Sequence, residues 1–222
     1  MNFKNVWFTL LWRILIIIST AYGIYAGVFL ISGETNFKIL LYYTMQSNLW
    51  CLILYSYIVV KMLYQLRKHQ SIQKKICSSW LKGGLTSAIL VTFLLYQFII
   101  IPYCLEHGSA HQMFSPSDIS VHYLAPFLVF IDFLLFDPKK QYSWYTPFQW
   151  LSIPILYFLF VVTCSFIHVP VPEPEHPFLY FFLDIGDIGI KGFSLNMIKL
   201  TLLFLSAGYF TVFINDIKIG KK

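Results

Sequence analysis

The chain has 222 residues, of which 58% are hydrophobic, 19% are aromatic and only 12% are charged. Soluble domains usually hold about 45–50% apolar and about 25% charged residues, so this composition excludes an ordinary soluble protein and indicates an integral membrane protein. The formal net charge of +6 therefore points to the inner leaflet of a membrane and not to nucleic acid, for which the chain carries no basic–aromatic motif.

Six apolar stretches are long enough to cross a bilayer as helices, since each span needs about 20 residues. The stretches are continuous and do not alternate between apolar and polar residues, as the strands of a transmembrane barrel do. We therefore predict one all-α membrane domain over residues 1–222, with six transmembrane helices at approximately 7–31, 38–60, 83–104, 119–136, 148–168 and 194–214.

Lys and Arg residues set the expected orientation, because short cytoplasmic loops carry an excess of them. Under this map twelve fall on one side of the membrane and three on the other, namely Lys38, Lys191 and Lys199. Arg13 falls near the inner end of the first helix, from which its side chain is expected to reach lipid phosphates. We predict a multi-pass protein of the cell membrane with both termini in the cytoplasm.

The first predicted helix carries a small-residue face formed by Gly23 and Gly27. Such faces let two helices approach closely. The contact can lie within the protomer or between protomers, so the two glycines are the candidate contact of a homo-oligomer.

The second predicted helix holds four hydrogen-bonding side chains within five residues: Thr44, Gln46, Ser47 and Asn48. At about 100° per residue Gln46 lies roughly opposite the other three, whose stripe continues through Cys51 and Tyr55. Lipid cannot satisfy these groups, so the stripe must face protein or water. It either holds helices together or forms part of a site.

The fourth predicted helix supplies a partner of different chemistry. His122 lies about three residues from the outer end of its helix and Thr44 about six residues from the outer end of its own, so their depths differ by only a few Å. A hydroxyl and an imidazole that meet there form a nucleophile–base pair; the alternative is an interfacial histidine wetted by water. Pro126, one turn below, frees a backbone carbonyl and can open the helix around a pocket.

Two acidic residues have open roles. Asp132 lies about 15 Å deeper than His122 and about 80° off its face, so we expect it to pair with another helix or to meet inner water beside Asp137. Asp184 lies in an apolar segment, residues 178–189, that is too short to span the bilayer. This segment can dip into the outer leaflet as a lid or re-entrant segment near the site, or lie at the surface with Asp184 in water.

No metal site and no cofactor are expected. His107 and His111 have the spacing of a metal pair, but the glutamate that follows the first histidine in a zinc protease is missing. The nearest stretch to a linker is the Pro-rich loop from His168 to Pro177.

The six-helix topology, the Thr44-Met-Gln-Ser-Asn48 block and the His122-x-x-x-Pro126 block resemble the androgen-induced membrane protein and androgen-dependent TFPI-regulating protein family. The resemblance covers most of the chain and looks closest to the bacterial branch of that family. Animal members hydrolyse fatty acid esters of hydroxy fatty acids with an intramembrane threonine and a histidine. The resemblance therefore implies that Thr44 is a nucleophile and His122 its base, while the substrate of the bacterial branch does not follow from it.

Three functions remain open at this point. The first is an intramembrane hydrolase of lipid esters, in which an oxyanion could be stabilised by donors from Asn48, Ser47 or Gln46. The second is a small-molecule or proton-linked carrier with a path lined by Thr44, Asn48, His122 and Asp132. The chain has no internal repeat, and its polar residues cluster at one depth, which speaks against a carrier. The third is a non-enzymatic membrane scaffold.

Overall fold

The computed structural model describes residues 6–30, 33, 35–68, 76–106, 113–167, 169 and 179–217. Within these residues the chain is all-helical and contains no strand. The described residues include six helical regions long and apolar enough to cross a membrane, the predicted number: Val6–Phe29, Tyr43–Arg67, Ser79–Glu106, Pro116–Phe136, Thr146–Phe166 and Ile185–Asp216. His107 and His111, and the Pro-rich loop apart from Val169, lie outside the described residues.

Several of these regions consist of more than one helix. The α-helices are α1 (Val6–Phe29), α2 (Tyr43–Arg67), α3 (Ser79–Leu95), α4 (Ile101–Glu106), α5 (Pro116–Ile119), α6 (Ala125–Phe136), α7 (Thr146–Trp150), α8 (Ser152–Phe166) and α9 (Ile185–Asp216). Two short 3₁₀ helices, Phe37–Leu41 and Phe181–Leu183, precede α2 and α9. The apolar segment before Asp184 therefore leads directly into α9, which is itself interrupted at Gly189 with φ 65°.

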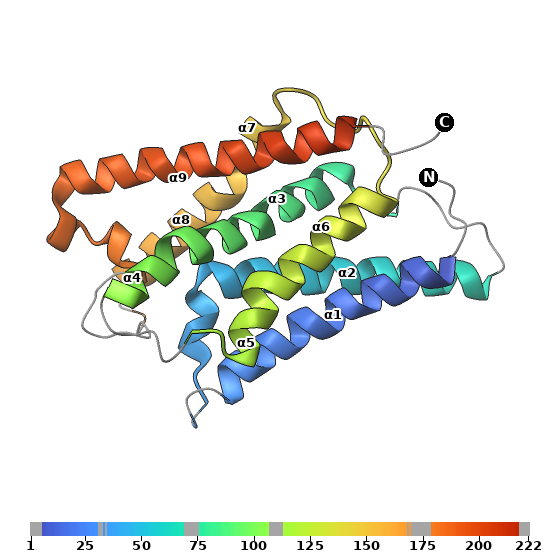
Figure 1. Ribbon diagram of the computed structural model, residues 1–222, viewed down its shortest axis with the longest axis horizontal. Coiled ribbons are helices and arrows are strands. Elements are labelled where there is room, and N and C mark those ends of the chain that lie inside the picture. Colours follow the sequence, from blue (N-terminus) through green and yellow to red (C-terminus); the bar gives the residue numbers. More distant parts are fainter. Residues whose placement is uncertain are drawn as a thin grey trace.

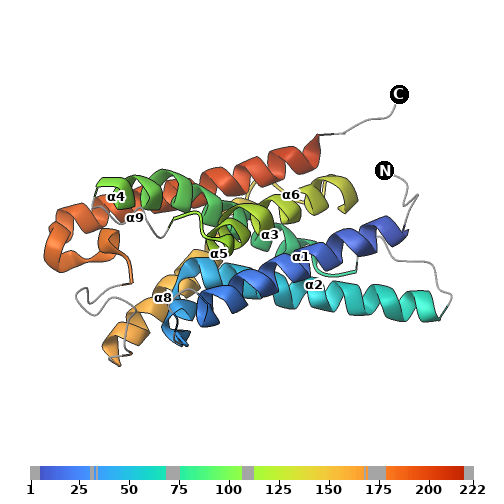
Figure 2. The ribbon, with the colours of Figure 1, turned by 60° about the horizontal axis from the view of Figure 1, so that its bottom comes forward.

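Helix α3 lies at the centre of the bundle. It packs against α2, α6 and α9, while α1 packs against α2 and α6. Figures 1 and 2 show that α1 and α3 begin, and α2, α6 and α9 end, at one end of the bundle. We call this the basic end, because Arg67, Lys82 and Lys139 lie there. We call the opposite end, with the 3₁₀ helix Phe37–Leu41 and α5, the site end.

The small-residue face of α1 is used inside the protomer. Gly23 and Gly27 are buried, and a Cβ on Gly23 would lie 2.4 Å from Val121 Cγ1, which is too close for any real side chain. Ser117 Oγ donates a hydrogen bond to Gly23 O at 2.9 Å across the same contact. The face therefore holds α1 against the segment that carries His122, and the structure does not leave it free for a second copy of the chain.

Two π turns interrupt helices near the site end, and proline explains both. The turns cover Tyr96–Ile100 and Ser120–Leu124. In each case the next residue donates its N–H to the carbonyl five residues back, and the residue after it is a proline, Pro102 or Pro126. Proline has no N–H for the carbonyl four residues back, so the helix changes its hydrogen-bond step at this point. The predicted opening of the helix at Pro126 is thus a π turn.

A buried ion network lies at the basic end. Asp132 Oδ1 accepts a hydrogen bond from Arg13 Nε at 3.0 Å, and Asp132 Oδ2 lies 2.6 Å from Lys82 Nζ and 3.1 Å from the Tyr55 hydroxyl. Lys82 also pairs with Asp137. Of the two expectations for Asp132, pairing with other helices is therefore the one that holds.

Two sequence predictions about basic residues are wrong. Arg13 is only 4% exposed and pairs with Asp132, so it does not extend to lipid phosphates. The helix predicted at 83–104 leaves Lys82 in the preceding loop, among the twelve basic residues of the cytoplasmic side, but Lys82 lies in the first turns of α3 and is buried. The sequence does not show that Arg13 and Lys82 both pair with Asp132, because the three residues belong to different helices, α1, α3 and α6.

Removing the Asp132 charge is expected to destabilise the fold strongly. In Asp132→Asn the buried Arg13 and Lys82 would share one remaining carboxylate, and an uncompensated buried charge costs about 3–5 kcal/mol. Thermal unfolding in detergent measures the effect. The matched control is Asp216→Asn at the exposed end of α9, which should change the free energy of unfolding by less than about 0.5 kcal/mol. Equal stability of the two variants would contradict the network's role.

The predicted orientation can be tested separately. The even number of spans places the start of α1 and the end of α9 at the same end of the bundle, and the excess of Lys and Arg predicts that this end is cytoplasmic. A reporter enzyme that works only in the cytoplasm, fused after Lys222, should be active. A reporter that works only outside the cytoplasm should be inactive there, and activity of the second reporter would invert the map.

Candidate active site

The site end is built around a break in the chain at Tyr42. This residue has an extended backbone (ψ 143°) and separates the 3₁₀ helix Phe37–Leu41 from α2. The break frees backbone groups that lipid cannot satisfy. Three side chains satisfy them: Gln46 Nε2 donates to Leu40 O at 2.7 Å, the Tyr157 hydroxyl donates to Leu41 O at 2.9 Å, and the Tyr180 hydroxyl accepts from Tyr43 N at 2.9 Å.

Tyr180 comes from the apolar segment that the sequence marks as a possible lid. Burial raises the pKa of its hydroxyl to about 12, so the group is a neutral phenol near pH 7 and can accept from the start of α2. The segment therefore contacts the first turn of α2, and the contact is made by Tyr180. Asp184 instead caps α9, where its Oδ1 accepts from Gly186 N at 2.9 Å.

Thr44 lies in the first turn of α2 and meets His122. Thr44 Oγ1 is 3.2 Å from His122 Nε2, which is within the hydrogen-bond reach expected from their similar depths. The two side chains are partly and almost fully buried, respectively, with His122 9% exposed. The pair therefore lies within the bundle and is largely shielded from solvent.

The second ring nitrogen of His122 decides the direction of this hydrogen bond. His122 Nδ1 lies 3.1 Å from Asp118 O, one helical turn earlier. A carbonyl oxygen only accepts, so Nδ1 carries the proton and Nε2 is left as an acceptor. Nε2 therefore accepts from the Thr44 hydroxyl, which is the arrangement that a general base requires. The Asp118 carboxylate is also close, with Oδ1 3.6 Å from Nδ1.

The ring of Tyr96 packs against one face of the His122 imidazole. The rings of Tyr96 and His122 stack with centroids 3.6 Å apart and planes 13° apart. Each ring belongs to one of the two π turns, so the proline-induced changes in two separate helices bring the rings together. Stacking on one face and the bond to Asp118 O together fix the orientation of the base.

Asn48 ties the two halves of the site to each other. Its Nδ2 donates to Thr44 O at 2.8 Å and to Val121 O at 3.1 Å. Both amide hydrogens are thus used, and Asn48 has no donor left for an oxyanion. Its Oδ1 is buried and has no hydrogen-bond partner among the described residues. Asn48 is therefore a positioning residue that links α2 to the π turn of His122.

The other two polar side chains of the second helix are also committed to neighbours. Ser47 Oγ donates to Thr44 O at 3.0 Å and lies 2.8 Å from Thr92 Oγ1 on α3. Gln46 is engaged with Leu40 O, as described above. Neither has a contact with His122 among those of the described residues, so both support the backbone around Thr44.

Backbone N–H groups replace these side chains as candidate oxyanion donors. The first turn of a helix leaves its N–H groups without an intrahelical carbonyl, and the helix dipole makes this end favourable for negative charge. Tyr43 N already donates to Tyr180. The Thr44 N–H is also hydrogen-bonded to the Tyr180 oxygen. The next N–H group belongs to Met45, directly beside the Thr44 hydroxyl.

Sequence reasoning missed two residues of this site. Asp118 and His122 stand four residues apart, a spacing that places them on one face of a helix and that could have indicated this contact. Tyr96 has a weaker signal: it precedes Pro102 by six residues, as Ser120 precedes Pro126. Nothing in the sequence shows that the two π turns face each other.

No protein-family model, curated protein or solved structure matches this chain.

The tautomer of His122 is directly measurable. We expect the proton on Nδ1, because Asp118 O can only accept. Nitrogen-15 NMR of histidine-labelled protein distinguishes the two tautomers, and His122→Gln identifies which signal belongs to His122. A proton found on Nε2 would reverse the hydrogen bond to Thr44 and contradict the general-base arrangement.

Proposed function

We propose that this protein is an intramembrane hydrolase of lipid (fatty-acyl) esters, with Thr44 as nucleophile and His122 as general base. The observation that carries the proposal is the 3.2 Å contact between Thr44 Oγ1 and His122 Nε2, with Nδ1 held by Asp118 O. A threonine hydroxyl is a weak nucleophile until a base takes its proton. Here the imidazole is held by Asp118 O so that Nε2 accepts from the Thr44 hydroxyl. This is the orientation that a general base requires.

The reaction follows in two halves. His122 Nε2 takes the Thr44 proton while Oγ1 attacks the ester carbonyl carbon, and the carbonyl oxygen becomes an oxyanion. The intermediate collapses, the alkoxide leaves with the proton from Nε2, and Thr44 carries the acyl group. Water then gives its proton to Nε2 and attacks the acyl-threonine, which releases the fatty acid and returns the proton to Thr44 Oγ1.

The oxyanion is stabilised by the backbone at the start of α2 in this proposal. The N–H group of Met45 has no intrahelical partner in the first helical turn, and backbone donors of this kind commonly serve acyl transfer. Asn48 acts indirectly, because its amide bonds to Thr44 O and Val121 O keep the nucleophile and the base in register.

The resemblance of the Thr44–Asn48 and His122–Pro126 blocks to a family of membrane threonine hydrolases agrees with this chemistry. On that resemblance we place the protein in the cell membrane of a bacterium. The positive-inside map puts the site end in the outer leaflet, so membrane lipids are its surroundings and the source of its ester substrate.

The carrier alternative finds less support. The polar site includes residues 44–48 of α2, and the ion network contacts α2 at Tyr55 and Met62. Between them the inward face of this helix contributes Cys51 and Leu54 to the apolar core. Asp132 is held by two cations. A carrier path through both clusters would have to cross this apolar layer.

Substitution of either member of the pair should remove most activity. Thr44→Ala and His122→Ala should each lower hydrolysis of a lipid ester by at least about a hundredfold, the lower end for one acid–base contribution. The double variant should be little worse than either single variant, because the two groups act as one unit. Thr44→Ser keeps the hydroxyl and should retain part of the activity. The measurement is release of fatty acid by purified protein in lipid nanodiscs.

The matched control is Thr163→Ala on α8. Thr163 is exposed and its hydroxyl only donates to Leu159 O within its own helix, so this variant should keep full activity. Melting curves must show that each variant is folded. Full activity of folded Thr44→Ala would end the nucleophile proposal.

A further inference from the structure

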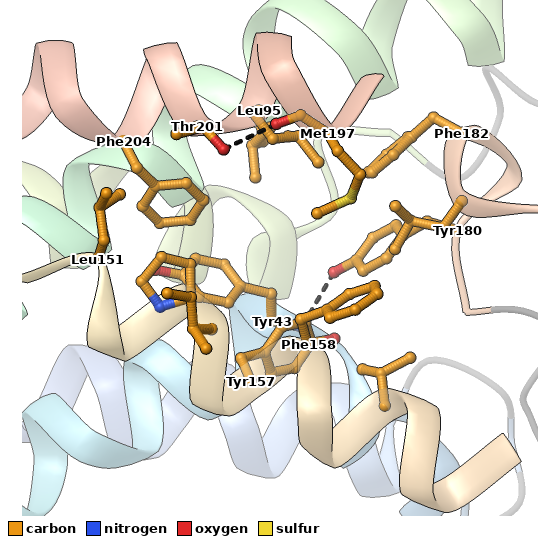
Figure 3. A pocket seen from close by; sticks show the side chains of 15 residues that line it. Tyr43, Leu95, Leu151, Tyr157, Phe158, Tyr180, Phe182, Met197, Thr201 and Phe204 are labelled. Carbon is orange, nitrogen blue, oxygen red and sulfur yellow. Dashed lines mark hydrogen bonds between the residues drawn. The ribbon is translucent and has the colours of Figure 1, made fainter. Parts of the chain in front are cut away.

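An apolar cavity of about 180 Å³ lies beside the start of α2, between α3, α8, α9 and the segment before α9. Figure 3 shows its wall, to which Tyr43, Leu95, Tyr157, Tyr180, Phe182 and Phe204 contribute side chains. Neither Thr44 nor His122 lines it. Apolar cavities of about 150 Å³ are large enough to stay dry and to bind small hydrocarbons, so this cavity is large enough to hold an apolar ligand.

The polar side chains of the wall are already committed. The Tyr43 hydroxyl donates to Ala88 O, the Tyr157 hydroxyl donates to Leu41 O, and Thr201 Oγ1 donates to Met197 O. Tyr180 uses its oxygen to accept from Tyr43 N. The Tyr180 hydroxyl is also hydrogen-bonded to the Tyr157 hydroxyl. These polar groups are thus engaged with neighbours in the protein, and the surface of the cavity suits a hydrocarbon ligand.

The cavity opens toward the lipid-facing side of the bundle. Its wall includes Ile155 on α8, which is 55% exposed, and Thr201 on α9, which is also exposed. Neighbouring residues on these two helices, among them Leu156, Leu159, Ile198 and Leu202, are exposed and apolar. In a membrane these surfaces face lipid chains, so the opening between α8 and α9 leads directly from the bilayer into the cavity.

The inner end of the cavity is adjacent to the proposed nucleophile. Tyr43 lies in the wall and is the residue before Thr44, so their Cα atoms are about 3.8 Å apart. Tyr180, which also lines the wall, accepts a hydrogen bond from the Tyr43 N–H. A lipid chain that fills the cavity therefore has one end beside the first turn of α2.

We propose that this cavity is a binding site for one hydrocarbon chain of a membrane lipid, which enters sideways between α8 and α9. Its identification as the acyl chain of the ester substrate rests on the proposed function. The chain site then selects for chain length, while the segment that carries Tyr180 separates the chain from the outer water. Binding itself needs neither Thr44 nor His122.

The test uses stearic acid with a nitroxide near the end of its chain, which cannot be hydrolysed. In phosphatidylcholine nanodiscs, electron paramagnetic resonance should show a motionally restricted component that saturates at about one label per chain of protein. Leu200→Trp fills part of the cavity and should weaken this binding at least about tenfold, the effect of losing burial for roughly two methylene groups. Leu202→Trp, two residues along on the exposed surface, should leave the binding unchanged.

A second pair of variants keeps the test decisive if one variant does not fold. Met197 lines the cavity and Ile198 does not, so Met197→Trp should weaken binding and its control Ile198→Trp should not. Equal binding in a wall variant and its control, or no saturable component in the wild type, would overturn the proposal. Thr44→Ala should bind the probe like the wild type. If Thr44→Ala proves fully active while the wall variants still lose binding, the hydrolase proposal fails and the chain site stands.

Discussion

Inside a bilayer every backbone N–H and C=O needs a partner within the protein, and the arrangement of the site end depends on how this requirement is met. The chain breaks at Tyr42, and three side chains from separate parts of the fold supply the missing partners: Gln46, Tyr157 and Tyr180. The break is what places Thr44 in the first turn of α2 and not in the middle of a helix. Backbone donors and the nucleophilic hydroxyl therefore lie side by side because the helix starts there.

The protein keeps its two polar clusters at opposite ends of the bundle and builds them differently. At the basic end four charged side chains and Tyr55 form a compact network in which formal charges cancel. At the site end the central pair is a hydroxyl and an imidazole oriented by a backbone carbonyl. A buried ion network is sensitive to the loss of any one charge, so it suits a role in fixing helix positions. A neutral pair leaves the imidazole free to take up a proton during a reaction.

The sequence predicts much of this arrangement and misses specific parts of it. Continuous apolar runs and one polar stripe are local patterns, so the six spans and the approach of Thr44 to His122 follow from helix geometry. The break at Tyr42 leaves no local signal, because residues 39–42 are as apolar as the helix that follows. The second span is therefore predicted to start too early, at residue 38. The contacts of Arg13 with Asp132 and of Tyr96 with His122 join different helices, and their rotation about the bundle axis cannot be read from one sequence. The apolar segment that contains Asp184 is predicted to lie near the site, and it does contact α2, but the contact is made by Tyr180, while Asp184 caps α9.

The central claim is that Thr44 forms a covalent bond with the acyl group of the substrate. A fluorophosphonate reports this directly, because the activated hydroxyl oxygen attacks phosphorus, fluoride leaves and a stable adduct remains on the nucleophile. Mass spectrometry of the labelled, digested protein should locate the adduct on Thr44, and Thr44→Ala should not be labelled. An adduct on another residue, or equal labelling of Thr44→Ala and the wild type, would contradict the account.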